Sequence, residues 1–151
     1  MPRWRRWATD DAGSASLEFV TAGMILLLPI VYLVLTMAGV QAGALAVEGA
    51  ARQAVRVFVQ ADDENAALSE AERAIDFALA DYGLDADAAR VTVSCRPRPT
   101  QCLNRRGTVT ITVGVSIPLP LVPPALTLKV PLSVPLQATA TQKVSRFWGA
   151  S

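Results

Sequence analysis

Histidine is absent from this chain of 151 residues, and only two of its residues are cysteines. Without an imidazole, the common catalytic triads and histidine bases are excluded, and a structural zinc site lacks ligands. No glycine-rich phosphate loop occurs either. These absences predict a protein that is not an enzyme and that uses no cofactor, no metal and no small-molecule substrate. The net charge of +1 gives no electrostatic reason to expect a nucleic-acid partner.

Acidic residues are also absent from Ala88 to the C-terminus, where eight basic residues occur. Between Asp62 and Asp87, by contrast, nine acids accompany a single base, Arg73. One interpretation is intramolecular, with an acidic helix lying against a basic sheet. The other is that complementary patches join neighbouring subunits head to tail and set their register.

Charge is missing once more between Phe19 and Val47. The most apolar part, Phe19 to Val40, has 22 residues, with Thr21 and Thr36 as its polar side chains. As a helix it extends about 33 Å at roughly 1.5 Å per residue. That length crosses a hydrocarbon core of about 30 Å.

Two alternatives compete with a membrane helix. A secretory signal could be cleaved near Ala42-Gly43-Ala44, but its apolar region should be only about 7 to 15 residues long. A buried helix of a soluble protein would seldom lack charge on every face for this length. Pro29 is compatible with a membrane helix and predicts a mild kink. The arginines before the segment favour a cytoplasmic N-terminus and an exported C-terminal part; they are Arg3, Arg5 and Arg6.

A short motif precedes the apolar segment, in the order Gly13-Ser-Ala-Ser-Leu-Glu18-Phe19. Glu18 alone could simply be an acid near the positive end of a helix dipole. A cut after Gly13, however, would give Ser14 a free ammonium group. A carboxylate near the bilayer costs a few kcal/mol unless it is paired, and this ammonium is the obvious partner for Glu18.

The motif and the segment behind it, together about Asp11 to Arg56, resemble the N-terminal region of TadE-like proteins. These are the minor pseudopilins of tight-adherence (Flp-type) pilus systems. The resemblance implies cleavage between Gly13 and Ser14 by a prepilin peptidase, with Glu18 and Phe19 as the processing and assembly motif. Its implied partners are the cytoplasmic membrane, the peptidase, other pilin subunits and the pilus assembly machinery.

The expected function is therefore that of a structural minor pseudopilin in the inner membrane, with one span and an extracytoplasmic C-terminal domain, and with possible incorporation into a surface pilus. The alternative is an uncleaved, membrane-anchored accessory protein that binds another secretion or envelope component. The expected organisation is a leader over 1–13, a hydrophobic helix over 14–60 and an exported domain over 61–148.

Periodicity predicts an α+β fold in which the membrane helix continues to Phe58 and Glu48 pairs with Arg52. The resemblance implies that this fold is type IV pilin-like. The apolar positions that indicate this continuation are Ala44, Val47, Ala51, Ala54, Val55 and Phe58. A second helix is expected from the N-cap Asp62 to Gly83. Its expected buried face consists of Leu68, Ala71, Ile75, Ala78, Leu79 and Tyr82.

Three segments are predicted to form an antiparallel sheet: Arg90 to Ser94, Thr108 to Ile117 and about Leu128 to Val144. In the second, valine and isoleucine alternate with threonine, glycine and serine, which is typical of a half-buried strand. Prolines at 131 and 135 place the third segment at an edge.

Cys95 and Cys102 lie between the first two of these strands. In an exported domain a disulfide is expected, in preference to free thiols. Arg105 and Arg106 belong to the same loop, which is either a solvated basic loop or a contact for an acidic neighbouring subunit.

A second uncharged stretch, from Gly107 to Leu128, is too rich in proline to form a continuous helix. It predicts a strand followed by an apolar loop from Ile117 to Leu126. This loop either folds back on its own sheet or lies against the membrane or a partner subunit.

Overall fold

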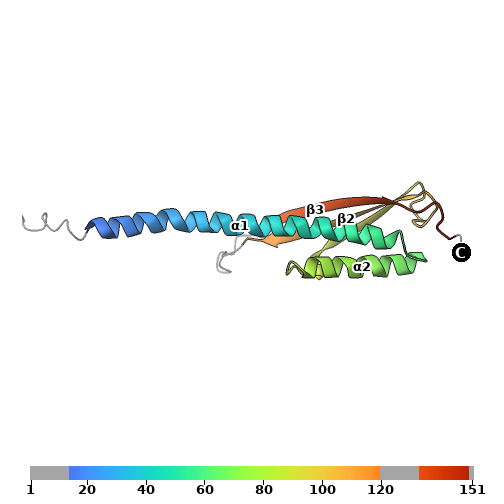
Figure 1. Cartoon of the computed structure of the whole chain (residues 1–151), viewed down its shortest axis with the longest axis horizontal. Coiled ribbons are helices and arrows are strands. Elements are labelled where there is room, and N and C mark those ends of the chain that lie inside the picture. The colour runs from blue at the N-terminus through green and yellow to red at the C-terminus, as the bar shows by residue number, and fades with distance from the viewer. Residues whose placement is uncertain (1–13, 120–132, 150–151) are drawn as a thin grey trace, which may run out of the picture. The chain divides into compact units, whose positions relative to one another are not determined.

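The computed structural model describes residues 14–119 and 133–149, and its elements are labelled in Figure 1. The chain divides into two compact units, one up to Met37 and the other from Ala38 onward. Helix α1 spans Ser14–Phe58 and contributes to both.

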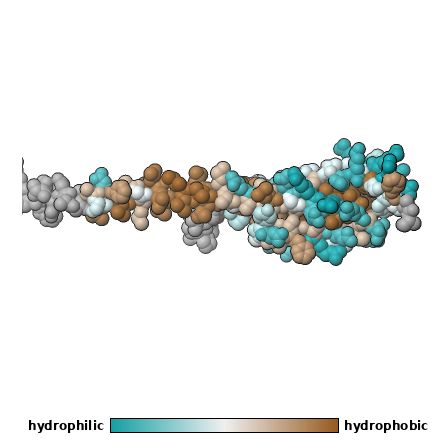
Figure 2. Space-filling view, viewed as in Figure 1, coloured by the Kyte–Doolittle hydropathy of each residue, from teal (hydrophilic) through white to brown (hydrophobic). Residues whose placement is uncertain are grey.

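In the first unit, α1 is a helix that is apolar on all sides. Its side chains from 15 to 35 are exposed, including Phe19 at 81%. Pro29 lies inside it, and Thr36 satisfies its own hydroxyl by donating to the Tyr32 carbonyl at 2.8 Å. Figure 2 shows hydrophobic residues over this part of α1. Among the described residues, α1 is the one helix long and apolar enough to cross a membrane.

In the second unit, the rest of α1 has one buried face. Small residues, mostly alanine, let neighbouring elements approach this face closely, and Phe58 closes its end at 1% exposure. The expected ion pair between Glu48 and Arg52 forms on the outer surface. Ala44 is exposed, although the sequence pattern includes it in the apolar stripe. The buried residues of α1 that face the core are Ala46, Val47, Ala50, Ala51, Ala54, Val55 and Phe58.

Helix α2 spans Glu64–Ala80. Its N-cap is Asp63 rather than the expected Asp62, and the Asp63 carboxylate accepts from the Ala66 amide at 2.9 Å. The helix ends before Gly83, whose φ of +68° is readily available to glycine. A short 3₁₀ turn, η1 (Ala86–Ala88), leads to the sheet.

The buried face of α2 differs from the expected one at three positions. Leu68 and Tyr82 are exposed, and Ala67, which the sequence analysis did not select, is completely buried. The reason is that the apolar stripe is wider than the surface that α1 and the sheet cover. The buried residues are Ala67, Ala71, Ile75 and Leu79, while Ala78 is half-buried.

The sheet has three antiparallel strands in the order β1-β2-β3, with β1 over Arg90–Arg96, β2 over Thr108–Pro118 and β3 over Ser133–Lys143. The prediction of an edge position for the third strand is confirmed, and Pro135 pairs there with Ser116. Its expected beginning, 128–132, lies outside the described residues.

The core of the second unit lies between the inner face of the sheet and the two helices. The prediction for β2 is confirmed, because its valines and isoleucines point inward and are buried. Gly43 of α1 permits a close approach, since a Cβ there would lie 2.8 Å from Ile117 Cδ1 and 2.9 Å from Leu136 Cδ1. The predicted α+β class is thus confirmed for the described residues.

Candidate functional site

The N-terminal motif lies in the first unit. Ser14 is the first residue of α1, and Glu18 and Phe19 follow within its first two turns, both exposed. Gly13 and the leader 1–13 lie outside the described residues. An exposed acid and an exposed aromatic at the start of an apolar helix are available to groups outside this chain.

The two cysteines lie in the second unit, at the end of the hairpin that joins β1 to β2. Their sulfur atoms are at disulfide distance, 1.93 Å, with 5.1 Å between the Cα atoms. The loop is also attached to α2, because the Cys102 amide donates to Glu64 Oε1 at 2.7 Å. The expected disulfide therefore closes the loop between β1 and β2, and the hydrogen bond from Cys102 to Glu64 attaches that loop to α2.

Arg105, a predicted subunit contact, makes bonds within its own molecule. Its Nε donates to the Trp148 carbonyl at 2.9 Å, and its guanidinium also reaches the Gly149 carbonyl at 3.3 Å. The indole of Trp148 in turn donates to the Ala61 carbonyl at 3.0 Å. This set of bonds, which we call the C-terminal clamp, joins three segments that are distant in sequence.

Arg106 is exposed and has a φ of +61°, the left-handed region that non-glycine residues seldom adopt. Both arginines are predicted as subunit contacts, but only Arg105 belongs to the C-terminal clamp, and the side chain of Arg106 lies outside it. The arginines and the cysteines share one loop, whereas Glu18 and Phe19 belong to the other unit. The predicted site residues therefore form two separate groups.

The acids of 62–87 and the bases after Ala88 form no close ion pair with one another among the described residues. Among the described residues, the one ion pair is that of Glu48 with Arg52, which involves neither the acids of 62–87 nor the bases after Ala88. The described residues therefore contain no ion pair that would support an acidic helix lying against a basic sheet. Figure 2 shows hydrophilic residues gathered over this unit.

The outer face of the sheet, directed away from the helices, is polar. Threonines face one another across β2 and β3, with hydroxyl oxygens 2.9 Å apart for Thr110 and Thr141 and 3.0 Å apart for Thr112 and Thr139. The register also places Arg90 of β1 and Gln137 of β3 on either side of Gly114. Since Gly114 has no side chain, the polar face is interrupted at this point.

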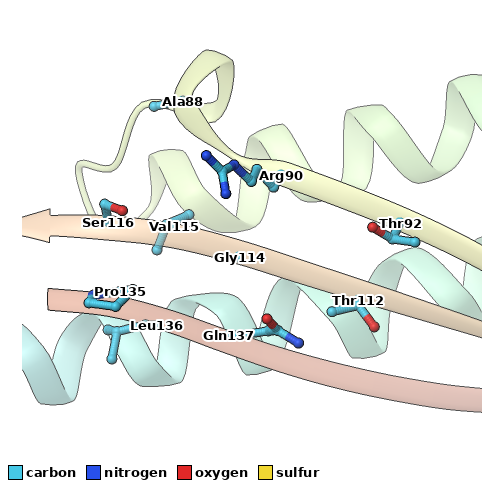
Figure 3. Close-up of a pocket in the computed structure, with 10 residues that line it drawn as sticks. All are labelled: Ala88, Arg90, Thr92, Thr112, Gly114, Val115, Ser116, Pro135, Leu136 and Gln137. Carbon is cyan, nitrogen blue, oxygen red and sulfur yellow. The ribbon is translucent and has the colours of Figure 1, made fainter.

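A hollow of about 720 Å³ lies over Gly114 on this outer face. Figure 3 shows the Arg90 guanidinium and the Gln137 amide on two sides of it, with the hydroxyls of Thr92 and Thr112 nearby. We call it the Gly114 hollow. Its lining offers hydrogen-bond donors and one positive charge, that of Arg90. The hollow therefore suits a partner whose surface is acidic or amphipathic.

A second, smaller hollow of about 320 Å³ lies between α1 and β3 and is lined in part by Val47, Leu136 and Ala138. Sequence reasoning found neither hollow. The sequence does contain a sign of the first hollow, because Gly114 interrupts the row of outward-facing threonines. Which residues surround Gly114, however, depends on the strand register.

No group of histidine, cysteine or carboxylate side chains suited to a metal ion occurs among the residues of 14–119 and 133–149. Comparison with known proteins gives no further assignment: no family model, no curated protein and no solved structure matches the chain.

Proposed function

We propose that this chain is a TadE-like minor pseudopilin, cut after Gly13 by a prepilin peptidase, that takes part in assembly of a tight-adherence pilus. It is a structural protein of the inner membrane and not an enzyme. In the proposed pilin-like arrangement, α1 lies in the membrane through residues 19–40 and the C-terminal domain lies outside the cytoplasm. The proposal rests on the resemblance of the N-terminal motif.

The structural observation that supports the membrane anchor in this proposal is the change of environment along α1. From Phe19 to Leu35 the helix exposes apolar side chains on every side, and from Ala46 to Phe58 the same helix supplies one face of a folded core. Exposed apolar surface of this length is unstable in water and favourable in lipid. A helix of this kind suits an anchor whose end belongs to a folded domain.

The start of α1 supports the assembly role. Ser14 begins the helix, and Glu18 is exposed one turn later. After cleavage, the ammonium of Ser14 and the carboxylate of Glu18 would have opposite charges near a bilayer, where a paired charge is far less costly than a single one. In an assembly, the ammonium of one copy can pair with Glu18 of the next.

Intact mass spectrometry of the protein extracted from membranes tests the proposal. A mature chain that begins at Ser14 is expected, and Gly13→Leu should leave the leader in place. Gly23→Leu is the matched control, since nothing lies within 4 Å of a Cβ at Gly23. A native chain that retains residues 1–13 would overturn processing and would favour the uncleaved accessory protein.

A second experiment separates assembly from insertion. Glu18→Ala should abolish incorporation into filaments while the chain remains in the membrane fraction. Glu48→Ala removes an exposed acid of the same helix, whose partner is Arg52, and should leave incorporation intact. Equal incorporation of both variants would contradict the role of Glu18.

A further inference from the structure

The outer surface of α2 carries an unusual exposed aromatic side chain. Phe77 is 74% exposed, although α2 buries a complete face elsewhere. It lies about halfway round the helix from the buried residues, since it is two residues from both Ile75 and Leu79. A phenylalanine at this position contributes nothing to the core of its own molecule.

Acids lie beside Phe77 on the same surface. Asp81 is one turn further along and Glu70 is two turns back, at the spacings that put helix residues on one side. Arg73 belongs to the same surface, where its Nε donates to the Ser69 carbonyl at 3.2 Å. Phe77 is thus an apolar projection with two acids beside it, and Arg73 is the one base on the same surface.

The Gly114 hollow has the complementary properties. It is concave where Phe77 projects, and the Arg90 guanidinium and the Gln137 amide at its rim can donate to carboxylates. Its floor is open because Gly114 lacks a side chain, and the nearest atom to a Cβ there would be the Leu136 carbonyl oxygen at 3.6 Å.

The two surfaces cannot meet within one molecule. The inward side chains of β2 contact the core, and the hollow lies on the opposite side of that strand. The buried residues of α2 contact the same core from the helix side, and Phe77 points away from it. The core therefore separates Phe77 from the Gly114 hollow.

We infer that Phe77 of one copy of this chain inserts into the Gly114 hollow of a second copy, with Asp81 and Glu70 directed toward Arg90. Charge complementarity selects this occupant: the nine acids of 62–87 form no close pair with the described bases, and the rim of the hollow is basic. Cleavage after Gly13 is not required for this contact.

The contact is heterologous, because it uses different surfaces on the two copies. Each docked copy still has a free Phe77 on one side and a free hollow on the other, so that the same contact can repeat. Such a contact produces a ring if the rotation closes and an open row of subunits if it does not. The second unit would then supply its own set of subunit contacts, besides those of α1.

Site-specific photocrosslinking of the full chain in its membrane tests the inference. Phe77 is replaced by a benzophenone amino acid, and light and isotope-labelled chains are co-expressed so that mixed-mass peptides identify links between copies. Links to the peptide that contains Gly114, or to the one that contains Gln137, are expected. The same probe at Leu68 of α2, which lies nearer the buried face, should not give them.

Two substitutions test the chemistry of the contact. Arg90→Asp should lower the yield of the link roughly tenfold, as expected for like charges at an interface, and Asp81→Arg in the same chain should restore it. Gly114→Val should remove the link by filling the hollow, and it fits a strand sterically. An unchanged thermal unfolding transition of each variant in detergent, followed by circular dichroism, shows that the second unit folds.

Several results would overturn the inference. Links from position 77 to α2 of the second copy would show a symmetric contact, and links only to another protein would show a different partner. Absence of links from position 77, or an undiminished yield in both Arg90→Asp and Gly114→Val, would also exclude the proposed contact.

Discussion

Two glycines in the same helix have opposite surroundings. A Cβ at Gly43 would lie 2.8 Å from Ile117 and 2.9 Å from Leu136, whereas a Cβ at Gly49 would meet nothing within 4 Å. Gly43→Ala should therefore leave the free energy of unfolding lower than Gly49→Ala does, because the same gain in helix preference is opposed by an overpacking cost of about 1 to 3 kcal/mol. Gly49→Ala should raise it by up to about 1 kcal/mol, because alanine favours the helix more than glycine does.

Thermal unfolding of the two variants in detergent, followed by circular dichroism, measures this difference. Each variant is the control for the other, since both add one methyl group to α1. The expectation fails if Gly43→Ala is as stable as Gly49→Ala.

Arg105 stabilises the C-terminal clamp through two carbonyls near the end of the chain. Arg105→Ala should lower the free energy of unfolding by about 0.5 to 1.5 kcal/mol, the usual net value of such bonds. Arg106→Ala alters the next residue, which is exposed and outside the clamp, and should change stability by less. Chemical denaturation of both variants, monitored by Trp148 fluorescence in a Trp4→Phe, Trp7→Phe background, distinguishes them, and equal losses would contradict the role of Arg105.

The sequence could not reveal the clamp. Arg105 and Trp148 are separated by 43 residues and Trp148 and Ala61 by 87, and no local pattern links positions so far apart. The pair of Glu48 and Arg52, which is local, was predictable from spacing alone and is confirmed.

The hairpin of β1 and β2 depends on its cross-link. Cys95 and Cys102 are separated by seven positions, and closing a loop of this size in the unfolded chain corresponds to about 2.5 kcal/mol. Replacement of both cysteines by alanine should reduce the free energy of unfolding by roughly that amount. Urea titration in detergent measures the loss.

Addition of a reductant serves as the control for this experiment. It should destabilise the native chain and leave the double alanine variant unchanged. A native chain that is insensitive to complete reduction would show that the disulfide adds little.

The strands were more predictable than the helix faces. In β2 every second residue is valine or isoleucine, and a period of two leaves one choice of buried face. In α2 the apolar stripe is broader than the covered surface, so Leu68 and Tyr82 at its margins are exposed. The Gly114 hollow depends on the register that places Arg90 and Gln137 beside Gly114, which the sequence pattern does not specify.

At the scale of the whole molecule, a charged substitution in the apolar part of α1 tests whether this helix spans a membrane. Leu26 and Leu45 are both exposed leucines of α1, at 67% and 59%. Leu26→Asp should reduce membrane insertion strongly, because an acid at a helix centre opposes insertion by about 2.5 to 3.5 kcal/mol. Leu45→Asp should insert normally, since residue 45 lies beyond the expected span.

Alkaline carbonate extraction of membranes, with immunoblotting of pellet and supernatant, provides the measurement. Release of the Leu26→Asp chain with retention of the Leu45→Asp chain is expected. Retention of both, or release of both, would place the span elsewhere.

The two compact units differ in how far composition alone predicts their structure. An apolar run with no charge from Phe19 to Val47 is enough to predict a long helix. The division at residues 37 and 38 was not predictable, because α1 continues through it. Only the packing of later elements on its second half distinguishes the units.

The order of elements also has a consequence for biosynthesis. The core of the second unit requires β3 and Val144, and the C-terminal clamp requires Trp148 and Gly149, all of which follow α1 and α2 in the chain and are translated after them. While the ribosome exit tunnel still covers these residues, α1 and α2 have no complete sheet against which to pack. The second unit can therefore complete its fold only after these later segments have left the tunnel, and until then Ile111 and Val113 of the inner face of β2 lack their buried surroundings.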